Sequence, residues 1–382
     1  MRRIYLDNAA TTQVLPCAVE AMLPYFTTLY GNPGGYHSFA REAHAGLDAA
    51  RRTVADCLGA QPGEIVFTGG GSEGDNMILR GIAHAYCKKG KHIITTAIEH
   101  HAILHTLLAM QAEGLADVTI LPVDSYGVVT ARQVQEAIRP DTILVSVMHA
   151  NNEVGSVEPV AEIGTVCRKA GVLLHTDAVQ SVGHIPVNVK TLQVDLLTMA
   201  AHKFHGPKGV GAIFVRKGVR LPALIEGGAQ ENNRRAGTEN IPGAVGLATA
   251  LQYQTEHLEE NMAKIGALRK RLILDLTTRI EGVTLNGHPT MRLPNNVNIC
   301  IEGVQSESVL LRLDQKGIAA AAGAACAAGA LDPSHVLLAM GVPTAAARGA
   351  LRLTMSAQTT AAELEYTVET LHNIVQALRY AN

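Results

Sequence analysis

The sequence predicts an α/β fold, in which helices cover both faces of a mostly parallel central sheet, followed by a smaller α+β domain. Between residues 64 and 215, short apolar strands alternate with helical stretches, a pattern typical of parallel βαβ units. After Gly243 the pattern changes to a long helical stretch, two neighbouring strands, a helix, and a last strand and helix. The chain of 382 residues is also long for a single core.

We therefore expect two domains. The large domain takes residues 16–256 and the small domain takes residues 257–382. The N-terminal segment 1–15 joins them. The boundary falls inside the long helical region, near residue 256.

Local signals justify the elements of the large domain. Pro16 suits the first turn of a helix that runs to Phe26, and the Ala-rich stretch 38–58 forms a helix that Gly59 ends. Later helices reach Tyr86 and about Gly114, and two more span 130–138 and 159–171. Strands are expected at 64–68, 92–98, 117–123, from 142 to a polar loop, and at 172–177, 194–200 and 210–215.

The small domain begins with the helical stretch 257–280. It continues with strands 283–287 and 295–301, helix 306–317, an Ala/Gly loop from Ala319 to Ala330, a short helix from Ser334, strand 350–355 and a terminal helix from Thr360.

Composition excludes several classes of protein. The formal net charge is −2, so no nucleic-acid or anionic-membrane partner is expected. No apolar run reaches the roughly 20 residues that span a bilayer. The six cysteines lie far apart without a CxxC pair, which argues against a structural zinc site or a disulfide framework and favours the reducing cytoplasm.

The chemistry centres on residues 194–215, where an apolar strand leads into His202-Lys203 and a Gly-rich turn before a second apolar strand. Lys203 has two possible explanations in this position. The first is structural, a surface lysine before a turn. The second is functional, a desolvated lysine that acts as a nucleophile and forms a Schiff base. A second Gly-rich turn at residues 69–71 opens a helix, where backbone N–H groups and the helix dipole favour an anion such as phosphate.

Polar residues follow the other strand ends, where open parallel sheets bind ligands. They are His100, Asn152, Asp177 and Gln180. Each has an ordinary structural explanation, such as a turn or a helix cap. Together with Lys203 they supply what pyridoxal 5'-phosphate (PLP) requires, namely a lysine, a carboxylate for the pyridine nitrogen, a ring to stack on and a phosphate site.

Ordered motifs along the whole chain resemble one family. They are "LDNAATT", "GNPGGYHSFAREA", "AIEHHAIL", "HANNEVG", "HTDAVQSVG", "AHKFHGPKGVG", "RRAGTEN", "GAACAAG" and "LRLTM". The chain is thereby similar to the cysteine desulfurases of the NifS/IscS type, within the class V aminotransferases. The resemblance implies the architecture of a fold-type I PLP-dependent transferase and a homodimer with active sites at the subunit interface.

The resemblance also implies residue roles. Lys203 would bind PLP covalently, His100 would stack on its ring and handle protons, and Asp177 would pair with the ring nitrogen. The other cofactor-binding residues would be Gly71, Ser72, Asn152, Gln180, His202 and, from the partner subunit, Thr238. The substrate-binding residues would be Asn32, Asn152 and Arg352, with Arg352 holding the substrate carboxylate as a bidentate fork.

Cys326 would be the sulfur acceptor. Its loop contains only Ala and Gly otherwise, which offers little packing and favours a reactive thiol over a structural one. The implied reaction converts L-cysteine to L-alanine and leaves a persulfide on Cys326 for a sulfur-acceptor protein, either an iron–sulfur scaffold or a thiolation protein. No resident metal is expected, although Cys326 could contact a cluster in transit.

The chain departs from the family mainly in its shortage of hydroxyl groups. The family usually has serine three residues before the lysine, where this chain has Ala200, and serines around the reactive cysteine. Gly34, Gly35, Gly69 and Gly74 occupy further positions where serine is usual. A lost hydrogen bond to a charged phosphate costs roughly 1.5–3 kcal/mol, so we expect weaker cofactor retention.

Two other functions stay open at this point. One is a selenocysteine lyase or a β-lyase acting on a cysteine derivative, which would use the same cofactor. The other is a weakly active scaffold paralogue of a sulfur pathway, which Ala200 suggests.

Overall fold

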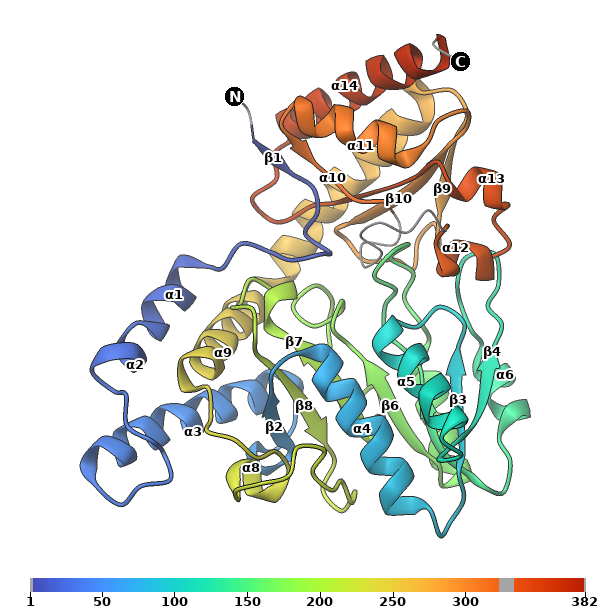
Figure 1. The fold of residues 1–382 in the computed structure, drawn as a ribbon. Coiled ribbons are helices and arrows are strands. Elements are labelled where there is room, and N and C mark those ends of the chain that lie inside the picture. The colour runs from blue at the N-terminus through green and yellow to red at the C-terminus, as the bar shows by residue number, and fades with distance from the viewer. Residues whose placement is uncertain (1–2, 323–332, 381–382) are drawn as a thin grey trace.

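The structure is a computed structural model that describes residues 3–322 and 333–380 (Figure 1). Its centre is a seven-stranded sheet with the spatial order β2-β8-β7-β6-β5-β3-β4. The strands are β2 (Ile65–Thr68), β3 (His92–Thr96), β4 (Asp117–Leu121), β5 (Thr142–Ser146), β6 (Leu173–Asp177), β7 (Leu196–Ala200) and β8 (Gly211–Val215). The α/β expectation with a mostly parallel sheet is confirmed.

One strand of this sheet runs against the others. β8 is antiparallel to both β2 and β7, and the remaining neighbours are parallel. The connection from β7 to β8 is a single 3-10 turn, Ala201–Lys203, and a Gly-rich loop. A parallel pair needs a crossover of a dozen or more residues, so this short connection requires antiparallel pairing.

Helices cover both faces of the sheet, and the strand residues alternate between them. Ile65 and Phe67 belong to the core on one face, with residues of α1 (Pro16–Met22), α3 (Ser38–Leu58), α7 (Val160–Ala170) and α9 (Ile241–Glu256). Val66 belongs to the core on the other face, with α4 (Gly71–Tyr86) and α5 (His101–Ala112). Both faces of the inner strands are therefore buried, which explains why apolar residues occupy consecutive positions in them.

A smaller α+β unit follows. Its antiparallel sheet has the order β12-β10-β9, from β9 (Val283–Asn286), β10 (Asn296–Ile301) and β12 (Ala350–Thr354). A separate apolar core joins this sheet to α10 (Leu258–Arg279), α11 (Ser306–Gln315) and α14 (Ala361–Tyr380). The remaining helices are α2 (Pro24–Thr27), α6 (Ala131–Ala137), α8 (Gln230–Asn233), α12 (His335–Ala339) and α13 (Thr344–Ala347). The helical path breaks at His257, between α9 and α10, and the division into domains at this point stays a prediction.

The N-terminal segment crosses from one unit to the other, as Figure 1 shows in dark blue. Strand β1 (Ile4–Tyr5) pairs in parallel with β11 (Ile318–Ala319) in the small unit. The prediction that a loop starts at Ala319 is therefore wrong by a residue or more, because Ala319 pairs with Tyr5. Beyond β1, the backbone N–H of Thr12 donates to the carbonyl of His202 in the large unit at 2.9 Å.

In the described residues, no helix combines the length and the apolar composition that crossing a membrane requires.

Candidate active site

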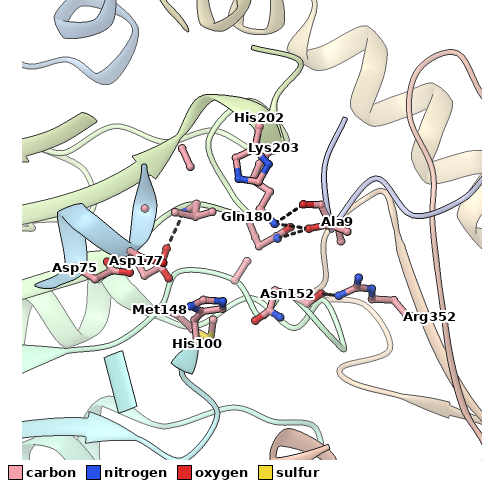
Figure 2. Close-up of a pocket in the computed structure, with 16 residues that line it drawn as sticks. Ala9, Asp75, His100, Met148, Asn152, Asp177, Gln180, His202, Lys203 and Arg352 are labelled. Carbon is pink, nitrogen blue, oxygen red and sulfur yellow. Dashed lines mark hydrogen bonds between the residues drawn. The ribbon is translucent and has the colours of Figure 1, made fainter. Parts of the chain in front are cut away.

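A cavity of about 380 Å³ opens where β6 and β7 end and α4 begins (Figure 2). The N-terminal segment and β12 close its other side. The cavity brings together most of the residues that the sequence suggested. Those lining it are Gly71, Ser72, His100, Asn152, Asp177, Gln180, His202, Lys203 and Arg352.

Lys203 reaches into the cavity from the 3-10 turn that follows β7. Its Nζ donates to the backbone carbonyls of Ala9 at 2.6 Å and Ala10 at 3.0 Å. The Nε2 of Gln180 donates to the same Ala9 carbonyl at 3.0 Å. The N-terminal segment therefore aims the amine into the cavity, as Figure 2 shows.

Asp177 ends β6 and lies on the cavity wall, only 5% exposed. Its Oδ1 accepts a hydrogen bond from the backbone N–H of Val179 at 2.9 Å. Burial raises the pKa of this carboxyl to about 6, against the opposing influence of the Val179 hydrogen bond and the charge of Lys203. A buried carboxylate in this position gains from a cationic ligand group.

His100 caps the N-terminus of α5, where its Nδ1 accepts a hydrogen bond from the backbone N–H of Ala102 at 3.1 Å. Burial lowers the pKa of His100 to about 4, and the charge of Lys203 contributes to the decrease. The ring is therefore neutral at pH 7 and presents a flat surface to the cavity, opposite Lys203 and Gln180 in Figure 2.

The Gly-rich turn at residues 69–71 leads into the N-terminus of α4, which lines the cavity, and its role as an anion cradle stays a prediction. Gly70 caps this helix with φ of 154° and ψ of −176°, a conformation that glycine adopts readily. A Cβ at Gly71 would lie 2.9 Å from Cγ2 of Val179, so the close approach of the helix requires glycine there as well. Ala200 faces this turn, and its methyl group would lie 3.7 Å from the same Cβ.

Arg352 approaches from β12 and is 1% exposed. Its Nη1 donates to the backbone carbonyl of Asn152 at 2.9 Å, and its Nη2 pairs with Asp7 at 3.0 Å. Its Nε is buried without a hydrogen-bond partner among the described residues. Asp7 and the Asn152 carbonyl thus hold the guanidinium at the cavity wall.

Among the described residues, two predicted site residues are not brought to this cavity. Asn32 is exposed in the loop before α3, where its Oδ1 accepts a hydrogen bond from Gly34 at 3.0 Å. Thr238 is absent from the residues that line the cavity. Cys326 lies outside the described residues.

Sequence reasoning missed four contributors to the site. The carbonyls of Ala9 and Ala10 hold Lys203, and backbone atoms leave no signal in side-chain patterns. Asp7 pairs with Arg352 across the fold. Asp75 lines the cavity from α4. The first turns of this helix are polar, so one more acidic residue there carried no distinct signal.

This geometry defines a ligand site that combines a lysine, a buried carboxylate, a neutral imidazole and a helix N-terminus. The sequence model of the Aminotransferase class-V family matches residues 4–367. The chain belongs to this family.

Two relatives within this family are similar to the chain over nearly its whole length. The protein named cysteine desulfurase IscS from Methanosarcina thermophila is 48% identical over 378 residues, which is 99% of this chain and 93% of that relative. The cysteine desulfurase IscS of Clostridium botulinum is also 48% identical, over 380 residues that cover 99% of this chain and 96% of the relative.

Solved structures agree with this family. One described as a NifS-like protein matches with a TM-score of 0.93 at 37% identity, covering 98% of this chain and 100% of that one. Another, described as SspA in complex with cysteine, has a TM-score of 0.83 and 35% identity over 94% of this chain and 100% of that one. The family resemblance and the fold-type I architecture predicted from the sequence are therefore confirmed.

Proposed function

We propose that the chain is a cysteine desulfurase that uses PLP to remove sulfur from L-cysteine and releases L-alanine. The observation that best supports this proposal is that Lys203, Asp177 and His100 line one cavity, with Arg352 at its far side. The names of the relatives support the activity, and the cavity residues support the cofactor.

The donor set of the cavity fits PLP. Lys203 would bind it covalently, and Asp177 would hold the proton of the ring nitrogen. His100 would stack on the ring, with Asn152 and Gln180 near its polar edge. The N-terminus of α4, Ser72 and His202 would hold the phosphate. When bound, PLP supplies a ring that withdraws electrons from the α-carbon of the substrate.

The chain's own groups would then act in sequence. Arg352 binds the substrate carboxylate, and the amine of Lys203 removes the α-proton. The thiolate of Cys326 attacks the substrate sulfur, so that an S–S bond forms as the Cβ–S bond breaks. One L-cysteine and the Cys326 thiol thus become L-alanine and a Cys326 persulfide, with no outside oxidant or reductant.

The direct test is a spectrum of the purified protein before and after L-cysteine is added, with alanine measured. We expect a visible band of the lysine-bound cofactor that changes on addition of cysteine, together with one alanine per sulfur released. The band should be missing in Lys203→Ala. A purified protein that takes up PLP but forms no alanine from cysteine would contradict the proposal.

The cradle offers a second prediction. Ala200→Ser places a hydroxyl beside the first residue of α4, where it can donate to the cofactor phosphate. We expect the dissociation constant of PLP, titrated into the apo-protein, to fall about tenfold, because a hydrogen bond to a charged group contributes roughly 1.5–3 kcal/mol. Ala150→Ser adds a hydroxyl elsewhere in the cavity and serves as the control. Equal affinity in Ala200→Ser and the wild type would show that the hydroxyl does not reach the phosphate.

The active form would be a homodimer. Large apolar side chains are exposed around α1, α2 and the start of α3, and Tyr36 in the intervening loop is 97% exposed. They are Val19, Leu23, Phe26, Tyr30 and Phe39. A second copy of the chain on this face would bury them, and it could supply Thr238 to the cofactor phosphate and Asn32 to the substrate.

The persulfide sulfur would pass to an acceptor protein for iron–sulfur cluster or thio-cofactor synthesis. We place the protein in the cytoplasm, because the five cysteines within the described ranges are all free, which suits a reducing compartment.

A further inference from the structure

A second carboxyl group lies beside Asp177. Asp75 belongs to α4, lines the cavity and is 1% exposed. Its Oδ1 has no hydrogen-bond partner among the described residues. Figure 2 draws Asp75 next to Asp177, on the side of Asp177 that is remote from Lys203.

The packing of α4 explains how this carboxyl enters the site. A Cβ at Gly74 would lie 2.8 Å from Cγ2 of Ile213 and 2.9 Å from Cγ2 of Thr198. Glycine at this position therefore lets the helix pack directly on β7 and β8. The next residue along the helix, Asp75, is consequently pressed against the sheet beside the end of β6.

Asp75 has no permanently cationic partner there. Across the part of the chain that the structure describes, the only basic side chain within ion-pair distance of its carboxylate is His175, with Nε2 at 3.8 Å from Oδ1. Burial lowers the pKa of His175 to about 3, so its ring is neutral. It is fixed by hydrogen bonds with Ser146 at 2.9 Å and Thr198 at 3.0 Å.

The two carboxyl groups are unlike in their surroundings. Burial raises the pKa of Asp75 well above its ordinary value, and the charges of Asp177 and Glu99 raise it further, while a hydrogen bond with Thr198 opposes the rise. Asp177 instead has the N–H of Val179 and the charge of Lys203 to favour its ionised form. Asp75 therefore carries the proton and Asp177 the negative charge in the ligand-free cavity.

We propose that Asp75 is a positioning residue that acts through Asp177, so that the pair of carboxyl groups holds a protonated ring nitrogen more strongly than Asp177 does alone. This inference rests on the proposed function. The positive charge of a protonated ring nitrogen beside Asp177 opposes the repulsion between the two carboxyl groups and so favours loss of the Asp75 proton. The ionised Asp75 then adds its attraction to that of Asp177, which a neutral amide does not supply.

The test compares two ligands in wild-type and Asp75→Asn apo-protein. One is PLP, and the other is the PLP analogue in which carbon replaces the ring nitrogen. We expect Asp75→Asn to weaken PLP binding by about tenfold, the equivalent of one pKa unit of interaction, and to leave the analogue's dissociation constant unchanged. In an Asp177→Asn background, Asp75→Asn should have no further effect on either ligand.

The outcomes are distinct. A purely structural role would weaken both ligands equally and would overturn the inference, as would equal affinities in wild-type and variant protein. If Asp75→Asn does not accumulate as folded protein, Asp75→Ala repeats the comparison, because the ratio between the two ligands does not depend on overall stability. Failure of the wild type to bind PLP would overturn the proposed function instead.

Discussion

We expect Cys326→Ser to lose sulfur transfer from L-cysteine by at least about 100-fold, the equivalent of about 2.7 kcal/mol of transition-state stabilisation. The serine hydroxyl is a far weaker nucleophile toward sulfur than a thiolate. Cofactor uptake should stay normal, since Cys326 is not among the residues proposed to hold PLP. The measurements are alanine and sulfide formation with cysteine as the substrate.

Cys87→Ser is the control, because Cys87 is an exposed cysteine that does not line the cavity. A β-lyase or a selenocysteine lyase would retain its activity in Cys326→Ser, since neither needs an enzyme thiol to accept sulfur. Normal alanine and sulfide formation by this variant would therefore favour a lyase. A wild-type protein that binds no PLP would instead favour a scaffold paralogue.

The second large effect concerns stability, and we expect Glu231→Ala to lower the free energy of unfolding by about 3–5 kcal/mol. Arg51 forms two hydrogen bonds with the Glu231 carboxylate, at 2.7 and 2.6 Å, and the N–H of Phe67 donates to it at 2.9 Å. Both side chains of the ion pair are largely buried. Removing Glu231 leaves a buried guanidinium and a backbone donor without their partner.

Urea unfolding measures this loss, with Arg132→Ala in an exposed ion pair as the control that should change little. The double variant Arg51→Met/Glu231→Met should recover much of the stability, because it leaves no unpaired charge in the core. If Glu231→Ala unfolds at the same urea concentration as the wild type, the pair contributes nothing to the fold.

The ion pair of Arg51 and Glu231 also stabilises the conformation of the segment that leads to Thr238. Glu231, Asn232 and Asn233 have φ values of 48°, 56° and 62°, a left-handed run without glycine. Residues other than glycine keep left-handed φ values only where surrounding contacts stabilise that conformation. The ion pair with Arg51 supplies such a contact. We therefore expect Glu231→Ala also to weaken cofactor binding in the proposed dimer.

The sequence predicted the elements well where local signals are strong. Apolar runs marked the strands of a sheet that helices cover on both faces, and the glycines at residues 69–71 marked the N-terminus of α4. The pairing of Ala319 with Tyr5 escaped prediction because the two strands are very short and lie at opposite ends of the chain.

Some residues of the candidate site were likewise predictable from local signals, and others were not. Lys203, Asp177 and His100 follow strand ends, so topology and motif both pointed to them. The contact between Asp7 and Arg352 depends on how the two units pack, which no local pattern encodes. In the proposed dimer Asn32 and Thr238 would come from a second chain, and the family motifs alone suggested their roles.

The route of the N-terminal segment has a consequence for synthesis of the protein. Ile4 and Leu6 donate backbone hydrogen bonds to the carbonyls of Gly317 and Ala319, and Leu6 accepts one from Thr354. During translation these first residues cannot form their hydrogen bonds with the small unit until nearly the whole chain has left the ribosome. The segment that holds Lys203 thus gains its contacts with the small unit late, and a truncated chain ending before β11 would keep only its contacts with the large unit, such as that of Thr12 with His202.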